Sequence, residues 1–443
     1  MADQSPPVSS DSNATGPVNP AGGSERWTSI DVVRGVAVLG ILPMNILSIG
    51  LPGAARLKPT IAGGFEGTDR LLWWLGYLLF DEKMIALFSM LFGAGLVLQA
   101  DRALQSGRSA AGLFYRRVFF LLLIGLVHAY FVWDGDILVT YALCGMLLYP
   151  ARRLPPRWLI GLGIAMLLVA VLGSVLIAFF FSEARSAAEH VLQQGLRGVP
   201  STDADRIAVK VWAEIRTSFY PTSDELFASL EQARNEGYLD HVRRKAPEAL
   251  AVQTELFLTA FLWLVGGRML IGMALMKLDI LTGKQSPRFY WCMAGIGYGI
   301  GLPSVALCGN YLIASQFDPV AIFGGGLLWN SFAGVLVALG HIGLVIAILK
   351  AGWMPNLTAH LAAVGRMALT NYLMQSLLCT TLFCGWGFGF IGQLDRTQLD
   401  AVVLSIWSLQ LAISPLWLQR FRFGPAEWLW RCLTYGKWQS LRS

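Results

Sequence analysis

Residues 29–52 read SIDVVRGVAVLGILPMNILSIGLP, an apolar run long enough to cross a bilayer as one helix. The run carries Asp31 and Arg34 at its start and Asn45 near its far end. Charges in or beside hydrocarbon cost roughly 2.5 to 3.5 kcal/mol each on insertion scales, so they usually face a protein interior or a wet cavity. We therefore expect this helix to line a polar site as well as to anchor the chain.

The composition excludes an ordinary soluble protein. The chain has 443 residues, of which 55% are hydrophobic and 14% charged, and its mean hydropathy is +0.54. The net charge of +6 is carried by short basic clusters between apolar runs, the pattern that the positive-inside rule produces. The charge therefore indicates membrane topology, and we expect no nucleic-acid partner.

The apolar runs predict an all-α polytopic protein with about ten transmembrane helices in one bundle. The second run contains Asp81, Glu82 and Lys83, which favours an interfacial helix followed by a true crossing from Met84. The ten spans are 29–51, 71–100, 112–133, 136–151, 157–182, 251–277, 287–314, 319–350, 357–384 and 398–420.

Basic clusters after every second span place those gaps, and both termini, on the cytoplasmic side. The polar stretch between the two sets of five helices then lies outside, where its amphipathic spacing predicts two or three helices that form either a lid over a site or a solvated connector. The predicted units are a disordered tail (1–25), an N-terminal transmembrane half (26–182), an extracytoplasmic helical insert (183–250), a C-terminal transmembrane half (251–420) and a basic cytoplasmic tail (421–443).

A helical hairpin is predicted around HAYFVWDGDILVTYALCG, residues 128–145. Gly135 permits a sharp reversal, so that His128 and Asp136 can face each other, with Asp134 beside them as a candidate substrate-binding residue. A carboxylate bonded to one imidazole nitrogen leaves the other free to act as a general base. The alternative is a buried histidine bonded to a carbonyl and an aspartate that only caps the next helix.

A second polar face is predicted in LAAVGRMALTNYLMQSLLCTT, residues 361–381. Asn371 and Gln375 are four residues apart and share a helix face, where they either bind a substrate or bond neighbouring helices. Arg366 and Arg34 lie on the inner side, where they either grip an anionic group or snorkel to lipid headgroups. The six cysteines lack the paired spacing of a metal site, so no metal is expected.

Four ordered motifs carry a resemblance to a known family. Arg34-Gly35 followed by Asn45, the segment HAYFVWDGDILVTYALCG, the segment GRMALTNYLMQS and the ending SPLWLQRFRFGPAEWLWRCLTYGK resemble the YeiB-like family of bacterial inner-membrane proteins. The resemblance covers nearly the whole chain from Trp27. The first helix is also similar, more distantly, to the transmembrane acyltransferase superfamily that includes heparan-alpha-glucosaminide N-acetyltransferase.

The superfamily resemblance implies transfer of an acyl group from cytoplasmic acyl-CoA to a small-molecule, lipid or glycan acceptor across the membrane. In that interpretation Arg34 and Arg366 hold the donor, Asn45 polarises the thioester and His128, oriented by Asp136, deprotonates a hydroxyl or amine. The lysosomal enzyme has its working histidine in the loop after the Asn, whereas GLPGAARLKPT here has none and offers Arg56.

Two other classes of function stay open. The same polar residues suit a transporter or lipid-handling protein that performs no chemistry, and a structural membrane partner would need no cavity at all. Membrane lipids are expected partners in each case, and a homo-oligomer is compatible with the sequence.

Overall fold

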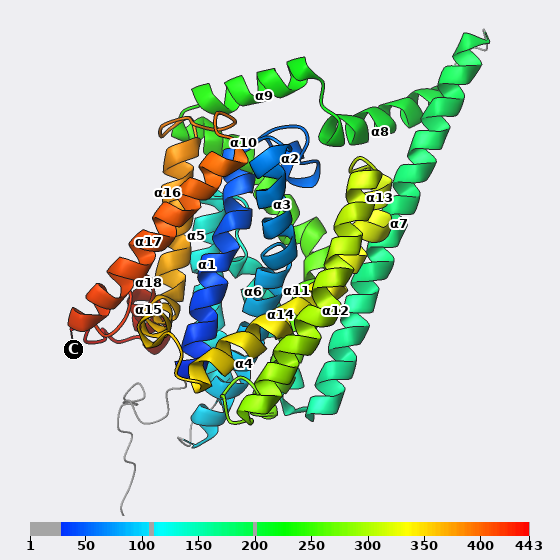
Figure 1. The fold of residues 1–443 in the computed structure, drawn as a ribbon. Helices are drawn as coiled ribbons and strands as arrows, with labels where there is room; N and C mark the ends of the chain where they lie inside the picture. Colours follow the sequence, from blue (N-terminus) through cyan, green and yellow to red (C-terminus); the bar gives the residue numbers. More distant parts are fainter. Residues whose placement is uncertain (1–27, 106–109, 198–201, 443) are drawn as a thin grey trace, which may run out of the picture.

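The computed structural model describes residues 28–105, 110–197 and 202–442, which form a bundle of helices (Figure 1). The predicted disordered tail (1–25) lies outside these residues. In chain order the elements are α1 (Thr28–Gly50), α2 (Ala54–Leu57), α3 (Gly67–Leu79), α4 (Lys83–Gln105), α5 (Ala110–Phe131), α6 (Leu138–Leu148), η1 (Tyr149–Arg153), α7 (Pro156–Leu196), α8 (Asp203–Phe219), α9 (Ser223–Asn235), α10 (Tyr238–Ala251), η2 (Val252–Phe261), α11 (Leu262–Lys277), α12 (Pro287–Ala314), α13 (Pro319–Ala321), η3 (Ile322–Gly326), α14 (Leu327–Lys350), α15 (Pro355–Arg366), α16 (Ala368–Phe383), α17 (Arg396–Arg420) and α18 (Pro425–Tyr435).

Eight helical stretches among the described residues are long and apolar enough to cross a membrane, which confirms a polytopic helical membrane protein. The other two predicted spans form shorter pieces. The span 136–151 becomes the 11-residue α6 followed by the 3₁₀ turn η1. The span 357–384 becomes α15 and α16, which are separated at Met367.

The predicted second span is interrupted inside the bundle. α3 ends at Leu79 and α4 begins at Lys83, and between them Glu82 has a φ of 62°, in the left-handed region that costs a side-chain-bearing residue free energy. Figure 1 shows α3 beside α1, and the stretch from Gly67 to Asp101 qualifies as one crossing. The predicted interfacial helix is therefore one half of a broken transmembrane helix.

Paired glycines bring α1 and α15 into backbone contact. A Cβ built on Gly35 would collide with the carbonyl oxygen of Leu361, and one built on Gly365 would collide with the carbonyl oxygen of Asp31. Small residues permit this approach in a membrane, where helix association depends on close packing. The contact places Arg34 and Arg366, each beside one of these glycines, at the same level of the bundle.

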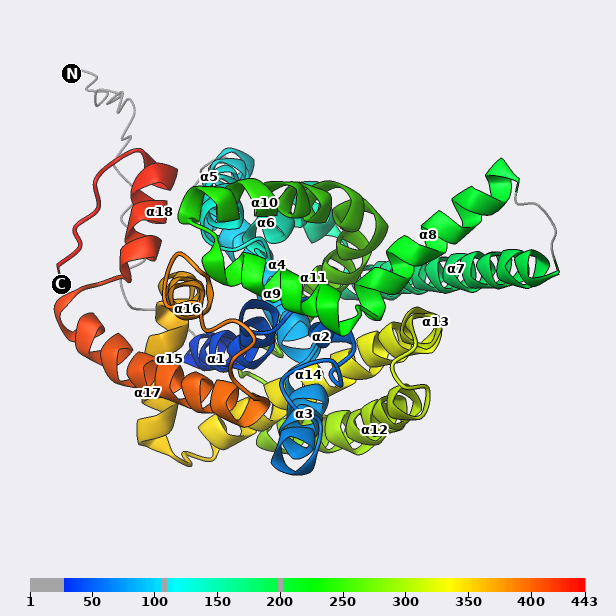
Figure 2. The same ribbon diagram turned by 90° about the horizontal axis from the view of Figure 1, so that it is seen from above.

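The bundle has two distinct ends in Figure 1. We call the end where α1 begins, α7 begins and α18 lies the basic end, and the opposite end, which carries α8, α9 and α10, the insert end. Figure 2, seen from above, shows α7 and α8 reaching outward from the bundle while α9 and α10 lie over it. α7 is a single helix of 41 residues, so the predicted span 157–182 continues unbroken into the predicted insert.

The insert helices are attached to the transmembrane helices at the insert end of the bundle. The Tyr238 hydroxyl donates to the Phe131 carbonyl at the end of α5, at 2.8 Å. The Arg234 Nε donates to the Ile391 carbonyl, and the Gly385 N–H to the Ala233 carbonyl, both in the loop after α16. These contacts support a lid over the ends of α5 and α16 rather than a solvated connector.

Candidate functional site

The predicted pair of His128 and Asp136 is present. His128 Nδ1 lies 2.8 Å from Asp136 Oδ1, and the two side chains are 2% and 1% exposed. Asp136 Oδ2 also accepts the N–H of Val139 at the start of α6, at 2.8 Å, so the carboxylate caps a helix and holds the imidazole at once. Within the described residues His128 Nε2 has no hydrogen-bond partner, which leaves this buried atom available to a ligand.

Tyr372 lies against the imidazole. Its ring centroid is 5.2 Å from that of His128, and its hydroxyl oxygen accepts the N–H of Ile137 at 3.4 Å. The sequence interpretation singled out Asn371 and Gln375 and missed Tyr372. Successive residues lie about 100° apart around a helix. Tyr372 therefore faces His128 and Ile137, while the Asn371 and Gln375 amides face α1 and α17.

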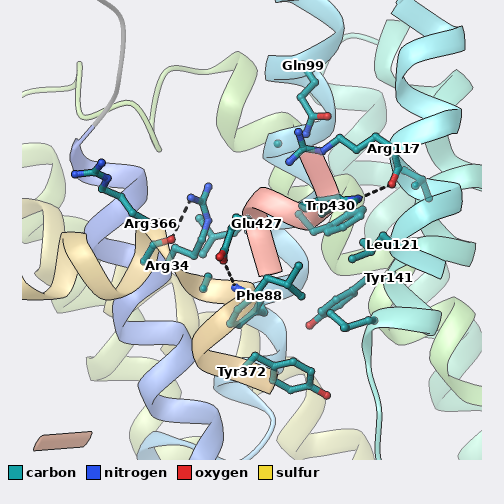
Figure 3. A pocket seen from close by; sticks show the side chains of 18 of the residues that line it. Arg34, Phe88, Gln99, Arg117, Leu121, Tyr141, Arg366, Tyr372, Glu427 and Trp430 are labelled. Atoms are coloured by element: carbon teal, nitrogen blue, oxygen red, sulfur yellow. Dashed lines mark hydrogen bonds between the residues drawn. The ribbon is translucent and has the colours of Figure 1, made fainter. Parts of the chain in front are cut away.

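A cavity of about 250 Å³ reaches from the basic end to these residues. Tyr372, Ile137 and Tyr141 line one end of it (Figure 3), so the His128–Asp136 pair lies directly behind its wall. Most of the wall between is apolar: Ile41, Phe88, Leu91, Phe92, Leu96, Phe114, Val118, Leu121 and Leu138.

Arginines surround the other end of this cavity, and we call it the arginine cavity. The two arginines that the sequence interpretation selected, Arg34 and Arg366, line it, and three that it did not select join them: Arg117, Arg422 and Arg431. Figure 3 shows the guanidinium groups of Arg34 and Arg117 approaching from opposite walls, while that of Arg366 is turned away. No sequence spacing relates Arg117 to Arg431, because α18 meets α5 only in the folded chain.

The contacts of Arg34 fix its orientation. Its NH1 lies 3.1 Å from Asp31 Oδ1 and 3.5 Å from the Gly365 carbonyl oxygen, and the side chain is 31% exposed. On the opposite wall the Arg117 guanidinium lies 4.0 Å from the centroid of the Trp430 ring. An arginine held by its neighbours retains donors for an anion and loses less entropy when it binds one.

Glu427 of α18 joins the arginine end to α16. Its carboxylate accepts the N–H groups of Leu369 and Thr370 and the Thr370 hydroxyl proton, which satisfies donors that the first turn of a helix leaves free. Burial raises the pKa of Glu427 above its usual value, against the effect of these hydrogen bonds. α18 is thereby fixed as one wall of the cavity.

The predicted amide face has a structural role. Asn371 Nδ2 donates to the Val364 carbonyl and to Ser414 Oγ of α17, both at 3.1 Å. Gln375 Nε2 donates to the Val38 carbonyl of α1 and to Gln410 Oε1. Neither residue lines the arginine cavity, so these contacts correspond to the alternative in which the amides bond neighbouring helices.

Asn45 and Asp134 also lie apart from the arginine cavity. Asn45 is half-buried near the insert end of α1. Asp134 lies 3.6 Å from Lys245 Nζ, so it attaches the insert helix α10 to the hairpin that holds His128. The insert therefore covers the hairpin at this point, and the arginine cavity approaches His128 from the basic end.

A second cavity, of about 350 Å³, lies toward the insert end beside the break between α3 and α4, and we call it the helix-break cavity. Its charged and amide lining residues are Arg56, Asp81, Glu82, Asn330, Arg396 and Asp400, and three of its aromatic lining residues are Trp73, Tyr77 and Trp407.

Buried partners neutralise the charges at the break. Glu82 Oε2 lies 2.6 Å from Arg268 NH2 of α11. Lys83 Nζ donates to Asn330 Oδ1 at 2.6 Å, and Asn330 Nδ2 donates to Asp81 Oδ2 at 3.0 Å. The sequence predicted a junction between two helices at these charges, but it took the first helix as interfacial and did not give the partners that allow the charges to be buried. Among the described residues no group of three metal-ligating side chains occurs.

The fold and the two cavities define a polytopic helical membrane protein with a buried histidine–aspartate pair behind an amphipathic cavity. Its sequence is 34% identical to "Uncharacterized protein YeiB" of Escherichia coli over 427 residues, 93% of this chain and 96% of that protein. The chain belongs to the YeiB-like family of bacterial membrane proteins.

Further similarities agree with this family. "Uncharacterized protein YxaH" of Bacillus subtilis is 28% identical over 94% of this chain and 96% of its own length. "Uncharacterized 39.9 kDa protein in amylase 3'region" of Bacillus acidopullulyticus is 26% identical over 95% of this chain and 97% of its own length. Residues 275–437 match the family described as "Protein of unknown function (DUF418)", a region that includes Arg366, Tyr372 and Glu427.

Proposed function

We propose that the protein is a membrane-embedded acyltransferase that takes an acyl group from acyl-CoA and passes it to a hydroxyl or amine acceptor. The observation that carries the proposal is the arginine cavity. It offers guanidinium groups at one end and an apolar wall along its length, and it ends at Tyr372 against the His128–Asp136 pair.

The positive-inside rule gives the orientation of this proposal. Arg152, Arg153 and Lys277 lie at helix ends on the basic end, which is where α18 and its arginines also lie. The basic end then faces the cytoplasm across a bacterial inner membrane, with both chain termini on that side. This is the compartment that supplies acyl-CoA, so the donor has direct access to the arginine cavity.

Donor binding follows from the order of groups along the cavity. The phosphates of acyl-CoA would lie between Arg34 and Arg117, where charge-assisted hydrogen bonds are strong. The acyl chain would contact the apolar wall, because burying each methylene contributes about 0.8 kcal/mol. The thioester is thereby directed toward Tyr372.

The pair of His128 and Asp136 would carry the proton transfers. Asp136 accepts a hydrogen bond from Nδ1–H, so Nε2 can take the proton of the acceptor as its oxygen or nitrogen attacks the thioester carbon. When the carbon–sulfur bond breaks, the imidazolium returns that proton to the leaving thiolate, which departs as CoA. Tyr372, rather than Asn45, lies close enough to His128 to donate a hydrogen bond to the oxyanion.

Reconstitution with labelled donors tests the activity directly. The purified full chain in liposomes of bacterial lipid is supplied with acetyl-CoA or palmitoyl-CoA that carries the label in the acyl group, and empty liposomes serve as the control. We expect free CoA to be released and the label to become covalently bound in the lipid or added amine fraction. Release of CoA no faster than from empty liposomes, with no labelled product, would exclude the transferase.

The helix-break cavity favours one second candidate, a transporter of an anionic amphiphile. Discontinuous transmembrane helices that line a binding site are common in alternating-access carriers, and the break between α3 and α4 lines this cavity. This candidate predicts that the label crosses the bilayer unchanged and that no CoA is released. The same reconstitution therefore separates the two functions.

A further inference from the structure

The helix-break cavity has features of a binding site separate from the arginine cavity. In a membrane, backbone that leaves the helical conformation is tolerated where it lines a cavity or is covered by protein. The turn at Asp81 and Glu82 lines this cavity, and Glu82 adopts a positive φ that costs roughly 1 to 3 kcal/mol unless the surroundings impose it. Broken helices of this kind commonly form ligand sites near the bilayer midplane.

Most polar groups of this cavity already have partners. Arg396 donates to the carbonyls of Pro59, Ala62 and Gly64, and so holds the loop before α3. Glu82 is paired with Arg268, and Asp81 is bonded to Asn330. These groups fix the shape of the cavity. Arg268 and Lys83 offset the charges of Glu82 and Asp81, whereas the hydrogen bonds of Arg396 go to carbonyl oxygens and its longer-range charge partners are Asp69 and Asp400.

Two charged groups of the wall have no such partner. In the part of the chain that the structure describes, neither Arg56 nor Asp400 forms a hydrogen bond or an ion pair with another side chain, although both line the cavity. Arg56 comes from α2 and is exposed, whereas Asp400 comes from α17 and is half-buried. A cation and an anion from different elements therefore face one cavity without a hydrogen-bond or ion-pair partner of their own. At longer range Arg56 interacts electrostatically with Asp81 and Glu82, and Asp400 with Arg396.

Aromatic rings line the same cavity. Trp73 stacks on Tyr77 with centroids 5.0 Å apart and an interplanar angle of 11°. Trp407 on α17 donates its Nε1 proton to the Leu39 carbonyl at 2.9 Å, which fixes the ring as part of the wall. Aromatic faces beside a carboxylate attract an ammonium group, and a guanidinium binds phosphate or carboxylate.

We propose that the helix-break cavity binds a zwitterion that carries an ammonium group and a phosphate or carboxylate. Asp400 and the aromatic rings take the ammonium, and Arg56 takes the anionic group. The ligand is neutral overall, and its two charges are opposite in sign to those of Asp400 and Arg56. An aminophospholipid headgroup and a free phosphoethanolamine compound share this chemistry.

The position of the cavity gives the ligand a role in acyl transfer, and this role rests on the proposed function. Ile41 lines the arginine cavity and Met44 the helix-break cavity, three residues or about 4.5 Å apart along α1. An amine bound in the helix-break cavity would be the acceptor that enters from the insert end. Binding itself does not depend on acyl transfer and is measured without acyl-CoA.

Binding is tested on the purified full chain in detergent by the quenching of tryptophan fluorescence. The probes are glycerophosphoethanolamine, ethanolamine and glycerol phosphate. We expect the zwitterion to bind at least about tenfold more tightly than either single-charge probe, since each charge-assisted contact contributes 1.4 kcal/mol or more. Equal affinity for the three probes, or no saturable binding of any, would overturn the proposal.

Two variants identify the contacts. Asp400→Asn should bind glycerophosphoethanolamine no more tightly than glycerol phosphate, because it has lost the contact to the ammonium group. Arg56→Gln should bind glycerophosphoethanolamine no more tightly than ethanolamine, because it has lost the contact to the phosphate. Asp203→Asn and Arg243→Gln change exposed residues of the insert and should bind like the parent protein. If both cavity variants keep the parent's preferences, these residues do not form the site.

A final comparison distinguishes the source of the zwitterion. The chain is placed in nanodiscs that contain either phosphatidylethanolamine or phosphatidylglycerol. If only phosphatidylethanolamine competes with glycerophosphoethanolamine, the ligand is a lipid headgroup. If neither lipid competes and the soluble probe binds, the ligand is the free compound. Competition by phosphatidylglycerol as strong as by phosphatidylethanolamine would show that the ammonium is not recognised and would contradict the proposal.

Discussion

The arginine cavity and the helix-break cavity use charge in opposite ways. In the arginine cavity the charges stand at one end and the remaining wall is apolar, so the cavity is suited to a ligand with an anionic head and an apolar tail. In the helix-break cavity the deepest charges are bonded to one another, and only wall residues remain available. Charge that is free can bind a ligand, and charge that is paired keeps a broken helix in place.

The largest expected effect concerns His128, which lies behind the arginine cavity. Replacing it in His128→Ala removes the proposed general base and should lower acyl transfer about 10² to 10⁴-fold, while zwitterion binding in the helix-break cavity is unchanged. Transfer is measured as CoA release in liposomes. His360→Ala, an exposed substitution, is the control, and retained transfer in His128→Ala would remove the base from the mechanism.

Breaking the pairs at the helix break should affect stability rather than chemistry. Glu82→Gln leaves Arg268 buried without its partner, and removing one member of a buried ion pair costs about 3 to 5 kcal/mol. The free energy of unfolding in detergent measures the loss. Glu248→Gln, which breaks the exposed pair with Lys245, should cost at most about 1 kcal/mol, and equal losses in the two variants would contradict a structural role for the buried pair.

Disrupting the glycine contact between α1 and α15 should have the next largest effect on stability. In Gly365→Ala the new methyl group meets the Asp31 carbonyl, and overpacking of this kind costs about 1 to 3 kcal/mol. The thermal unfolding midpoint reports it. Gly295→Ala has nothing within 4 Å of the new Cβ and should leave the midpoint unchanged; a similar fall in both variants would show that the close crossing is not responsible.

The smallest effect is expected at the arginines. Arg34→Gln combined with Arg117→Gln should raise the KM for acyl-CoA about tenfold and leave kcat nearly unchanged, because the lost contacts hold the substrate and its transition state equally. Added salt should weaken the parent protein's binding more than the variant's. A fall in kcat with an unchanged KM would instead assign these arginines to the chemical step.

The sequence predicted what depends on neighbouring residues and missed what depends on distant ones. Apolar runs gave the helical membrane fold, and the reversal at Gly135 gave the His128–Asp136 pair, because both are local. Tyr372 could be placed only once α16 lay against His128 and Ile137, and Arg431 only once α18 lay against α5. Asn371 and Gln375 share a face as predicted, but which helix that face meets is decided by packing.

The break between α3 and α4 marks the same limit. Asp81, Glu82 and Lys83 were visible as charges, but their partners Asn330 and Arg268 lie far away in the sequence. From the sequence alone, three unpaired charges indicated a helix at the membrane surface. Because the folded chain supplies partners, these charges can be buried inside the bundle.

The central claim is that the arginine cavity holds the acyl donor. A cryo-electron microscopy map of the full chain in nanodiscs with a thioether analogue of palmitoyl-CoA would test it most directly. We predict density for the phosphates between Arg34 and Arg117 and for the thioether sulfur beside Tyr372. Density for the analogue in the helix-break cavity alone, or an unoccupied arginine cavity at saturating analogue, would contradict the claim.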